Sequence, residues 1–200
     1  PLVLTIHHGV PATNLQQLVA HAQANPGKLN YGSSGVGTTY HLAAELLGMR
    51  TGVQMNHIPY KGSAQTFADL LGGNIHLAFD APLAPMPHLS SGKLRVLGTT
   101  GRNRLPQLPN VPTFMEQGIP NYELELRWGV LGPKGIPREV ATRLHAETVK
   151  IAAIPEVKEA FAKLAIEPST CSSLPACAAE LKAESDLVGN IIRTVGIKLE

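Results

Sequence analysis

Residues 29–39 read LNYGSSGVGTT, and this stretch decides the fold. It begins as a short strand, continues as a turn with glycines at 32, 35 and 37, and ends in two threonines that open a helix over about 39–49. Glycine permits positive φ angles and close approach of the backbone to a ligand. The start of a helix attracts a carboxylate or phosphate through unpaired N–H groups. An equally open interpretation is a structural turn whose threonine caps its own helix.

The strand–turn–helix unit recurs along the chain. We expect strands at 3–6, 54–59, 75–79 and 94–99, and helices at 14–25, 64–71 and 85–90. Alternation of this kind predicts βαβ units and an α/β fold with a mainly parallel open sheet flanked by helices. Ligands bind beyond the carboxyl ends of the strands in such sheets. The turns at 32–39, 60–63 and 80–82 are therefore expected on one rim, as a binding site.

The pattern changes after residue 100. A proline-rich loop over 102–112 leads to Thr113, which we expect to cap a short helix with Glu116 as its capping-box partner. Alternating apolar residues over 122–131 predict a long strand. The remainder is typical of helices, at about 138–153, 156–164 and 175–194.

Composition excludes several classes of protein. The net charge is +2 and Lys and Arg form no run, so nucleic acid is not an expected partner. No apolar stretch is long enough for membrane insertion. None of the eight histidines has a metal-ligand spacing with an acidic partner, so we expect neither a metal nor a cofactor. The first residues resemble a strand entered in mid-fold rather than an export signal.

Catalysis has little support in the sequence. Ser33 and Ser34 do not form a nucleophile elbow, because Val36 stands where that motif requires glycine. We therefore expect no catalytic residues, and a hydrolase using Ser33 or Ser34 is the rival hypothesis. Cys171 and Cys177 lie close enough to close a small disulfide loop, but the spacing favours two reduced cysteines that act as small apolar residues near a helix start.

Four motifs together resemble one family. They are NYGSSGVGT at 30–38, HIPYKG at 57–62, SGKLRVL at 91–97 and LPNVPTFME at 108–116. In this order and spacing they are similar to the receptors of tripartite tricarboxylate transporters, the Bug or TctC solute-binding proteins. The resemblance covers essentially the whole chain. It implies a periplasmic-binding-protein fold of type II, in which two α/β lobes enclose the ligand.

The resemblance also implies a division of the chain. Residues 1–9 would be a crossover strand from the first lobe, 10–124 the second, ligand-binding lobe, and 125–200 the return crossover and helical remainder of the first lobe. Members begin with a further N-terminal region that contains an export signal and a glycine-rich loop. We expect that half of the first lobe to be absent from these 200 residues.

The implied function is that of a non-catalytic, monomeric, periplasmic receptor. It would capture a di- or tricarboxylate, acidic amino acid or aromatic acid and deliver it to the small and large membrane subunits of the transporter. A sensing receptor for a two-component system is an alternative that the sequence leaves open. The residues expected to bind the ligand are Ser34, Gly35, Gly37, Thr38, Thr39, Tyr60, Lys61, Asp80 and Ala81.

Overall fold

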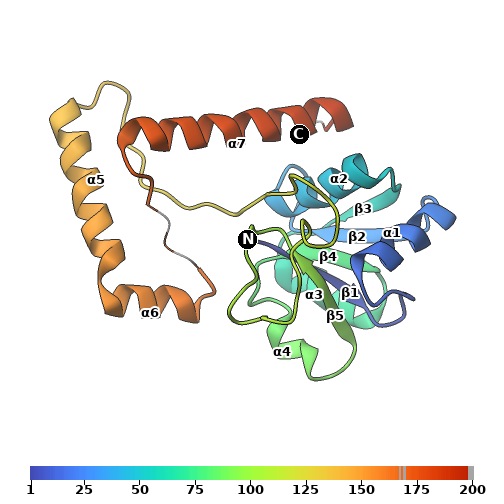
Figure 1. The fold of residues 1–200 in the computed structure, drawn as a ribbon. Coiled ribbons are helices and arrows are strands. Elements are labelled where there is room, and N and C mark those ends of the chain that lie inside the picture. The colour runs from blue at the N-terminus through green and yellow to red at the C-terminus, as the bar shows by residue number, and fades with distance from the viewer. Residues whose placement is uncertain (167, 169, 198–200) are drawn as a thin grey trace. The chain divides into compact units, whose positions relative to one another are not determined.

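A computed structural model describes residues 1–166, 168 and 170–197 (Figure 1). The chain forms two units: residues 1–126 with the end of the chain from residue 191, and residues 127–190. All five strands of the described chain belong to the first unit. None of the described helices is long and apolar enough to cross a membrane.

The sheet of the first unit is open, as expected, but it is mixed rather than mainly parallel, because two of its four strand pairs are antiparallel. Its strands are β1 (Val3–His7), β2 (Leu29–Ser33), β3 (Met55–Pro59), β4 (Leu77–Asp80) and β5 (Leu94–Thr99), in the order β3-β2-β4-β1-β5. β2 pairs in parallel with both β3 and β4. β1 pairs antiparallel with β4 and β5, so it runs opposite to the other four.

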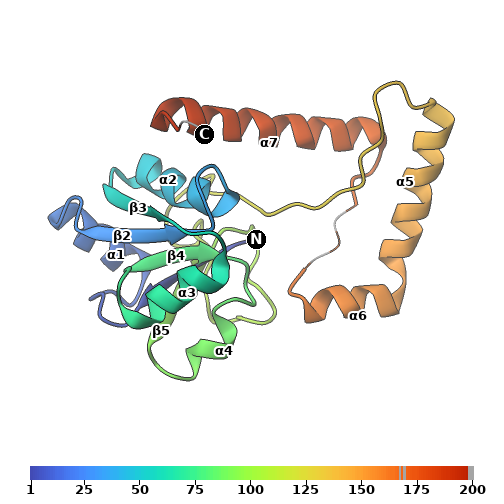
Figure 2. The ribbon, with the colours of Figure 1, turned by 180° about the vertical axis from the view of Figure 1, so that it is seen from behind.

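Four helices accompany the sheet: α1 (Leu15–Ala24), α2 (Thr39–Thr51), α3 (Ser63–Gly72) and α4 (Met86–Leu89). Tyr31 reaches Glu45 on α2, whereas the Cα of its neighbour Gly32 faces Thr66 on α3. Neighbouring residues of a strand point to opposite faces. The helices α2 and α3 therefore cover opposite faces of the sheet, as Figure 2 shows from behind.

Gly32 allows α3 to lie close to the sheet. A Cβ atom at this position would lie 2.5 Å from Ile75 Cδ1 and 2.6 Å from Thr66 Cγ2, which is closer than non-bonded carbon atoms approach. The glycine of the NYGSS motif therefore serves packing, in addition to the turn that follows it.

The core of the first unit includes three aromatic rings from distant parts of the chain. Phe114 lies 4.4 Å from Tyr122 and 5.8 Å from Phe79 between ring centroids. Thr113 and Glu116 form the expected reciprocal cap, with Thr113 N donating to Glu116 Oε2 (2.7 Å) and Glu116 N to Thr113 Oγ1 (3.0 Å). The capped segment is a turn rather than the expected helix, since the chain continues without regular structure.

The strand expected over residues 122–131 does not form. Tyr122 and Leu124 are buried, but Trp128 is 67% exposed and Val130 is 82% exposed. A strand needs a neighbour whose N–H and C=O groups complete its hydrogen bonds. No strand in the described part of the chain pairs with this segment. The strand predicted from the alternating pattern was therefore wrong.

The second unit is helical, as the sequence predicts. It contains α5 (Arg138–Ala153), α6 (Pro155–Lys163) and most of α7 (Leu174–Val195), which continues into the first unit at Ile191. No residue of α5 or α6 is buried. These helices therefore have no hydrophobic core of their own.

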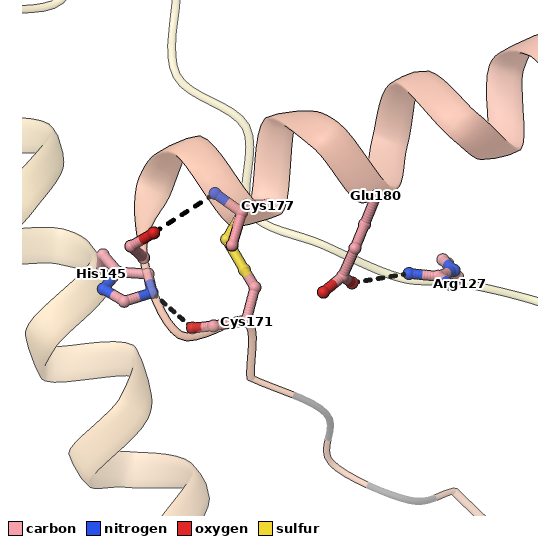
Figure 3. Close-up of a disulfide and its surroundings, with 7 residues drawn as sticks. Arg127, His145, Cys171, Cys177 and Glu180 are labelled. Carbon is pink, nitrogen blue, oxygen red and sulfur yellow. Dashed lines mark hydrogen bonds and ion pairs between the residues drawn. A yellow bond between two sulfur atoms is a disulfide. The ribbon is translucent and has the colours of Figure 1, made fainter.

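A disulfide joins Cys171 to Cys177 before and within the first turns of α7, which decides between the two states that the sequence allowed (Figure 3). His145 on α5 is hydrogen-bonded through Nε2 to the carbonyl oxygen of Cys171 (3.0 Å). Arg127 forms ion pairs with Glu180 (3.3 Å) and Glu184 (3.0 Å). Covalent and polar links thus connect parts of the second unit.

Candidate functional site: a glycine-rich loop at the strand ends

Three turns meet at one edge of the sheet. β3, β2 and β4 are neighbours and run parallel, so their carboxyl ends lie together. The turns after them begin at Ser34, Tyr60 and Ala81. The Tyr60 N–H donates to the carbonyl oxygen of Ser33 (2.9 Å), which joins the first two turns directly. The rim that the sequence predicts is therefore present.

The first turn is shaped by two glycines and one threonine. Gly35 has φ 130° and Gly37 has φ 77°, values that residues with a side chain rarely adopt. Thr38 caps α2: its Oγ1 donates to the Gly35 carbonyl oxygen (2.8 Å) and accepts from His41 N (3.5 Å). Helix geometry leaves the N–H groups of Thr39 and Tyr40 without intrahelical acceptors. The turn thus places helix-terminal donors at the rim.

Asp80 lies at the end of β4 and is almost completely buried, with 3% of its surface exposed. Its carboxylate accepts hydrogen bonds from the Ala81 N–H (2.7 Å) and from the side chains of Ser63 and Tyr40. Burial raises the pKa of Asp80, against the three hydrogen bonds that favour its charged form. Burial, together with the Asp80 charge, also raises the pKa of Tyr40 to about 12. Asp80 and Ala81 are therefore tied to the first turn of α2 through Tyr40.

Tyr60 and Lys61 form the second turn. The Tyr60 hydroxyl donates to Asp69 Oδ2 on α3 (2.7 Å), and burial with this partner raises the pKa of Tyr60 to about 12. The Lys61 side chain is exposed, and its backbone N–H donates to Gln65 Oε1 (3.2 Å). In this structure the Tyr60 hydroxyl therefore braces α3.

A polar network lies behind the glycine turn. The Gly37 N–H donates to His41 Nδ1 (2.9 Å), and His41 Nε2 lies 3.6 Å from Glu45 Oε1. The Tyr31 hydroxyl also bonds to Glu45. The His41 ring stacks on His57 with 3.9 Å between centroids and 9° between planes. The network therefore connects the turn to β2, α2 and β3.

Burial and hydrogen bonds together set the charges of His57 and Glu45 in this network. Burial and the neighbouring His41 lower the pKa of His57 to about 4, against the opposite influence of Glu45. Burial alone would raise the pKa of Glu45, but hydrogen bonds from His41 and Tyr31 outweigh it and hold that pKa below its usual value. His57 is therefore neutral and Glu45 negative at neutral pH.

A serine and a histidine come together in the site, which bears on the hydrolase hypothesis. Ser33 Oγ lies 2.6 Å from His57 Nε2. The Ser33 side chain is also engaged by the Gly35 carbonyl oxygen (3.0 Å) and the Gly35 N–H (3.2 Å), and Ser33 is only 1% exposed. A nucleophile must reach the atom that it attacks. Ser33 in this arrangement holds the turn rather than facing a substrate.

The described residues contain one group with the donor types of a metal site, namely His145, Cys171 and Cys177, whose potential ligand atoms lie within 4.8 Å of one another. The thiolate is the form of cysteine that binds metals. Because the two sulfur atoms are joined in the disulfide, this group has no thiolate to offer.

Sequence reasoning found the rim but missed the network behind it. His41 and Glu45 are four residues apart on a helix that the sequence predicts, so their spacing on one helical face was an available signal. His57 carried no such signal. It meets Tyr31 because β2 and β3 pair in parallel with these two residues in register.

An open α/β sheet with a glycine-rich turn at a helix N-terminus is compatible with the class of periplasmic-type solute-binding proteins, and solved structures of that class are similar to this chain. Residues 1–197 match the family described as tripartite tricarboxylate transporter family receptor, and the chain belongs to this family. The resemblance found in the four sequence motifs is thereby confirmed.

Similar proteins include both relatives and solved structures. A Pseudomonas sp. (strain P51) protein, described as the UPF0065 protein in the tcbD-tcbE intergenic region, is 39% identical over 188 residues, which are 93% of this chain and 55% of that protein. The R. palustris protein Rpa4515, solved with adipate, has a TM-score of 0.83 and 32% identity, and the match covers 98% of this chain and 66% of that one. The periplasmic binding protein BugD has a TM-score of 0.78 and 27% identity, covering 100% and 67%.

The chain spans about half the length of the curated relatives that it matches, with 55%, 48% and 52% of three of them covered.

Proposed function

We propose that this chain forms the ligand-binding lobe of a periplasmic receptor that captures a small carboxylate and delivers it to the membrane subunits of a tripartite tricarboxylate transporter. The observation that carries the proposal is the capped N-terminus of α2, opened by the Gly35–Gly37 turn at the strand ends. Backbone N–H groups at a helix start favour an anion. The adipate in the related R. palustris structure supports a carboxylate as that anion.

We infer that the nine residues expected from the sequence border the ligand, with Tyr60 contributing through its turn because its hydroxyl bonds to Asp69. Ser34, Gly35, Gly37, Thr38 and Thr39 supply the carboxylate-binding turn, and Tyr60 and Lys61 border it. In the proposed lobe, residues 10–124 hold this rim, and residues 1–9 and 125–200 belong to the crossovers and the other lobe. The ligand is enclosed when the lobes close, because closure adds contacts that the open state lacks.

Asp80 selects among carboxylates in this proposal. A charged Asp80 repels the second carboxylate of a pure dicarboxylate unless a water or cation lies between them. It accepts a hydrogen bond from a ligand that carries an amine or a hydroxyl. The raised pKa of Asp80 favours its neutral form more than usual, which weakens the repulsion.

The proposal is tested by isothermal titration of the protein with adipate, citrate, glutamate and benzoate. We expect micromolar to millimolar binding of at least one of these acids. The Thr38→Val variant, which loses the hydroxyl that caps α2, weakens that binding roughly tenfold, the cost of about one hydrogen bond. Thr51→Val is the matched control, since Thr51 Oγ1 bonds to the Leu47 carbonyl oxygen (2.6 Å) at the other end of α2.

In the same titration, the Asp80→Asn variant distinguishes dicarboxylate ligands from amino-acid ligands by the direction in which their affinity changes. Dicarboxylate binding strengthens in this variant when the Asp80 charge opposes the ligand, and amino-acid binding weakens when Asp80 accepts from the amine. Absence of binding for every acid, or ester turnover that the Ser33→Ala variant loses, would contradict the proposed receptor function.

A further inference from the structure

The glycine turn is anchored by a histidine that does not itself line the rim. The Gly37 N–H donates to His41 Nδ1 at 2.9 Å. His41 is 5% exposed and lies one helical turn along α2 from the cap. The position of Gly37 therefore depends on an acceptor that a single proton can remove.

The surroundings of His41 fix which of its nitrogen atoms carries hydrogen. Glu45 Oε1 faces Nε2, and Glu45 is kept negative by the hydrogen bonds from His41 and Tyr31. A negative partner favours N–H at Nε2, and a neutral imidazole then has an unprotonated Nδ1. Glu45 thus favours the tautomer of His41 whose Nδ1 can accept the hydrogen bond from the Gly37 N–H.

The second histidine limits the charge of the pair. His57 stacks on His41 at 3.9 Å, and Tyr31 stacks on His57 at 4.8 Å, so the titratable groups facing His41 are Glu45, His57 and Tyr31. Two positive rings at this distance repel each other strongly. Since His57 is held neutral down to about pH 4, the stacked pair does not carry two positive charges above that pH.

We propose that His41 is a positioning residue for the ligand turn: its unprotonated Nδ1 holds the Gly37 N–H in place, and a proton on Nδ1 releases the turn and weakens ligand binding. This inference rests on the proposed function of the same site. Protonated His41 presents an N–H to the Gly37 N–H, so the two donors separate and the Gly35–Gly37 turn loses its inward anchor. Carboxylate affinity is therefore high while Nδ1 accepts the Gly37 N–H and falls once Nδ1 is protonated.

Three substitutions at one position separate this role from simple packing. In His41→Asn the amide oxygen replaces Nδ1 as an acceptor and does not titrate, whereas His41→Leu fills space without an acceptor. We expect His41→Asn to bind the best acid of the panel within about threefold of wild type at pH 8, and His41→Leu roughly tenfold more weakly, which corresponds to one lost hydrogen bond. His21→Asn, on α1, is the control for the chemical change alone.

The pH profile is the decisive measurement. Ligand protonation affects all variants equally, so the ratio of wild-type to His41→Asn affinity isolates His41. We expect this ratio to fall roughly tenfold once the His41 ring gains a second proton, an event that the NMR signals of that ring report directly. A flat ratio, or a His41→Leu variant that binds like wild type, would overturn the proposal.

A readout without ligand distinguishes this inference from the proposed function. The NMR signal of the Gly37 amide in the ligand-free protein shifts and loses exchange protection when the signals of the His41 ring show that it has become protonated, and it does neither in His41→Asn. If no acid binds but this signal behaves as stated, the receptor function fails and the anchoring role stands. If protonation of His41 changes neither the chemical shift nor the exchange protection of the Gly37 amide, the anchoring role is refuted whether or not ligands bind.

Discussion

The two units of the molecule keep their shape by different means. The first unit surrounds its sheet with buried side chains such as Leu4 and Phe79, and Phe114 and Tyr122 from its irregular segments are also buried. In the second unit α5 and α6 bury no residue, and Leu144, Ile151 and Phe161 are exposed on their surfaces. Helices can be specified by local sequence, whereas a folded core requires contacts between distant residues. The glycine turn belongs to the unit that has such a core.

The largest expected effect contrasts one aromatic side chain from each unit. Tyr122→Ala removes a fully buried ring that contacts Phe79 and Phe114 and whose hydroxyl bonds to the Ala43 carbonyl oxygen, so we expect the free energy of unfolding to fall by about 3–5 kcal/mol. Phe161→Ala, at a ring that is 36% exposed, lowers it by less than about 1 kcal/mol. Urea denaturation followed by tyrosine fluorescence and circular dichroism measures both. Equal losses of unfolding free energy in the two variants would contradict the proposed difference between the units.

A smaller effect follows from opening the disulfide of the second unit. Cys171 and Cys177 are separated by six positions, and closing so short a loop stabilises the chain by about 2 kcal/mol. In the Cys171→Ser, Cys177→Ser double variant we expect faster amide hydrogen exchange near His145 and in the first turns of α7. Exchange in β2 and β4 stays unchanged, and wild type treated with a dithiol reductant is the matched comparison. Faster exchange in these strands would show that the first unit depends on the link.

The smallest effect concerns the ion pairs of Arg127 with Glu180 and Glu184. The Arg127 side chain is half-exposed, so solvent screens both pairs, and Arg127→Ala is expected to cost less than about 1 kcal/mol. The loss should disappear in about 1 M salt, where charges are screened within a few ångströms. Thermal unfolding at two salt concentrations measures it, with Arg127→Lys as the charge-preserving control. A larger loss of unfolding free energy that is independent of salt would mean that Arg127 stabilises the protein by packing of its side chain rather than by its ion pairs.

Prediction from sequence succeeded where neighbouring residues carry the information. The helix expected over 138–153 is found at Arg138–Ala153, and the Thr113–Glu116 cap forms as its spacing predicts. The strand expected over 122–131 failed for the opposite reason. Its alternation was genuine, since Tyr122 and Leu124 are buried, but no neighbouring strand in the described chain completes its hydrogen bonds.

Some features of the candidate site were likewise predicted from the sequence, and others were not. The glycine turn, its capping threonine and the rim of three strand ends were predicted from motifs and from the order of elements. The stack of His41 on His57, the contact of Ser33 with His57 and the bond from Tyr40 to Asp80 were not. Each of these pairs joins residues from different elements, and its existence depends on which strands are neighbours.

The sequence by itself determined the family, the βαβ organisation, the position of the glycine turn and the helices of the second unit, because turns, caps and helices depend on residues a few positions apart. The tertiary structure decided the place of β1 between β4 and β5, the joining of Cys171 to Cys177, and the anchoring of Gly37 by His41. His41 holds the turn because Glu45, His57 and Tyr31 surround it from α2, β3 and β2. That arrangement arises from the strand order and parallel register, which no local pattern specifies.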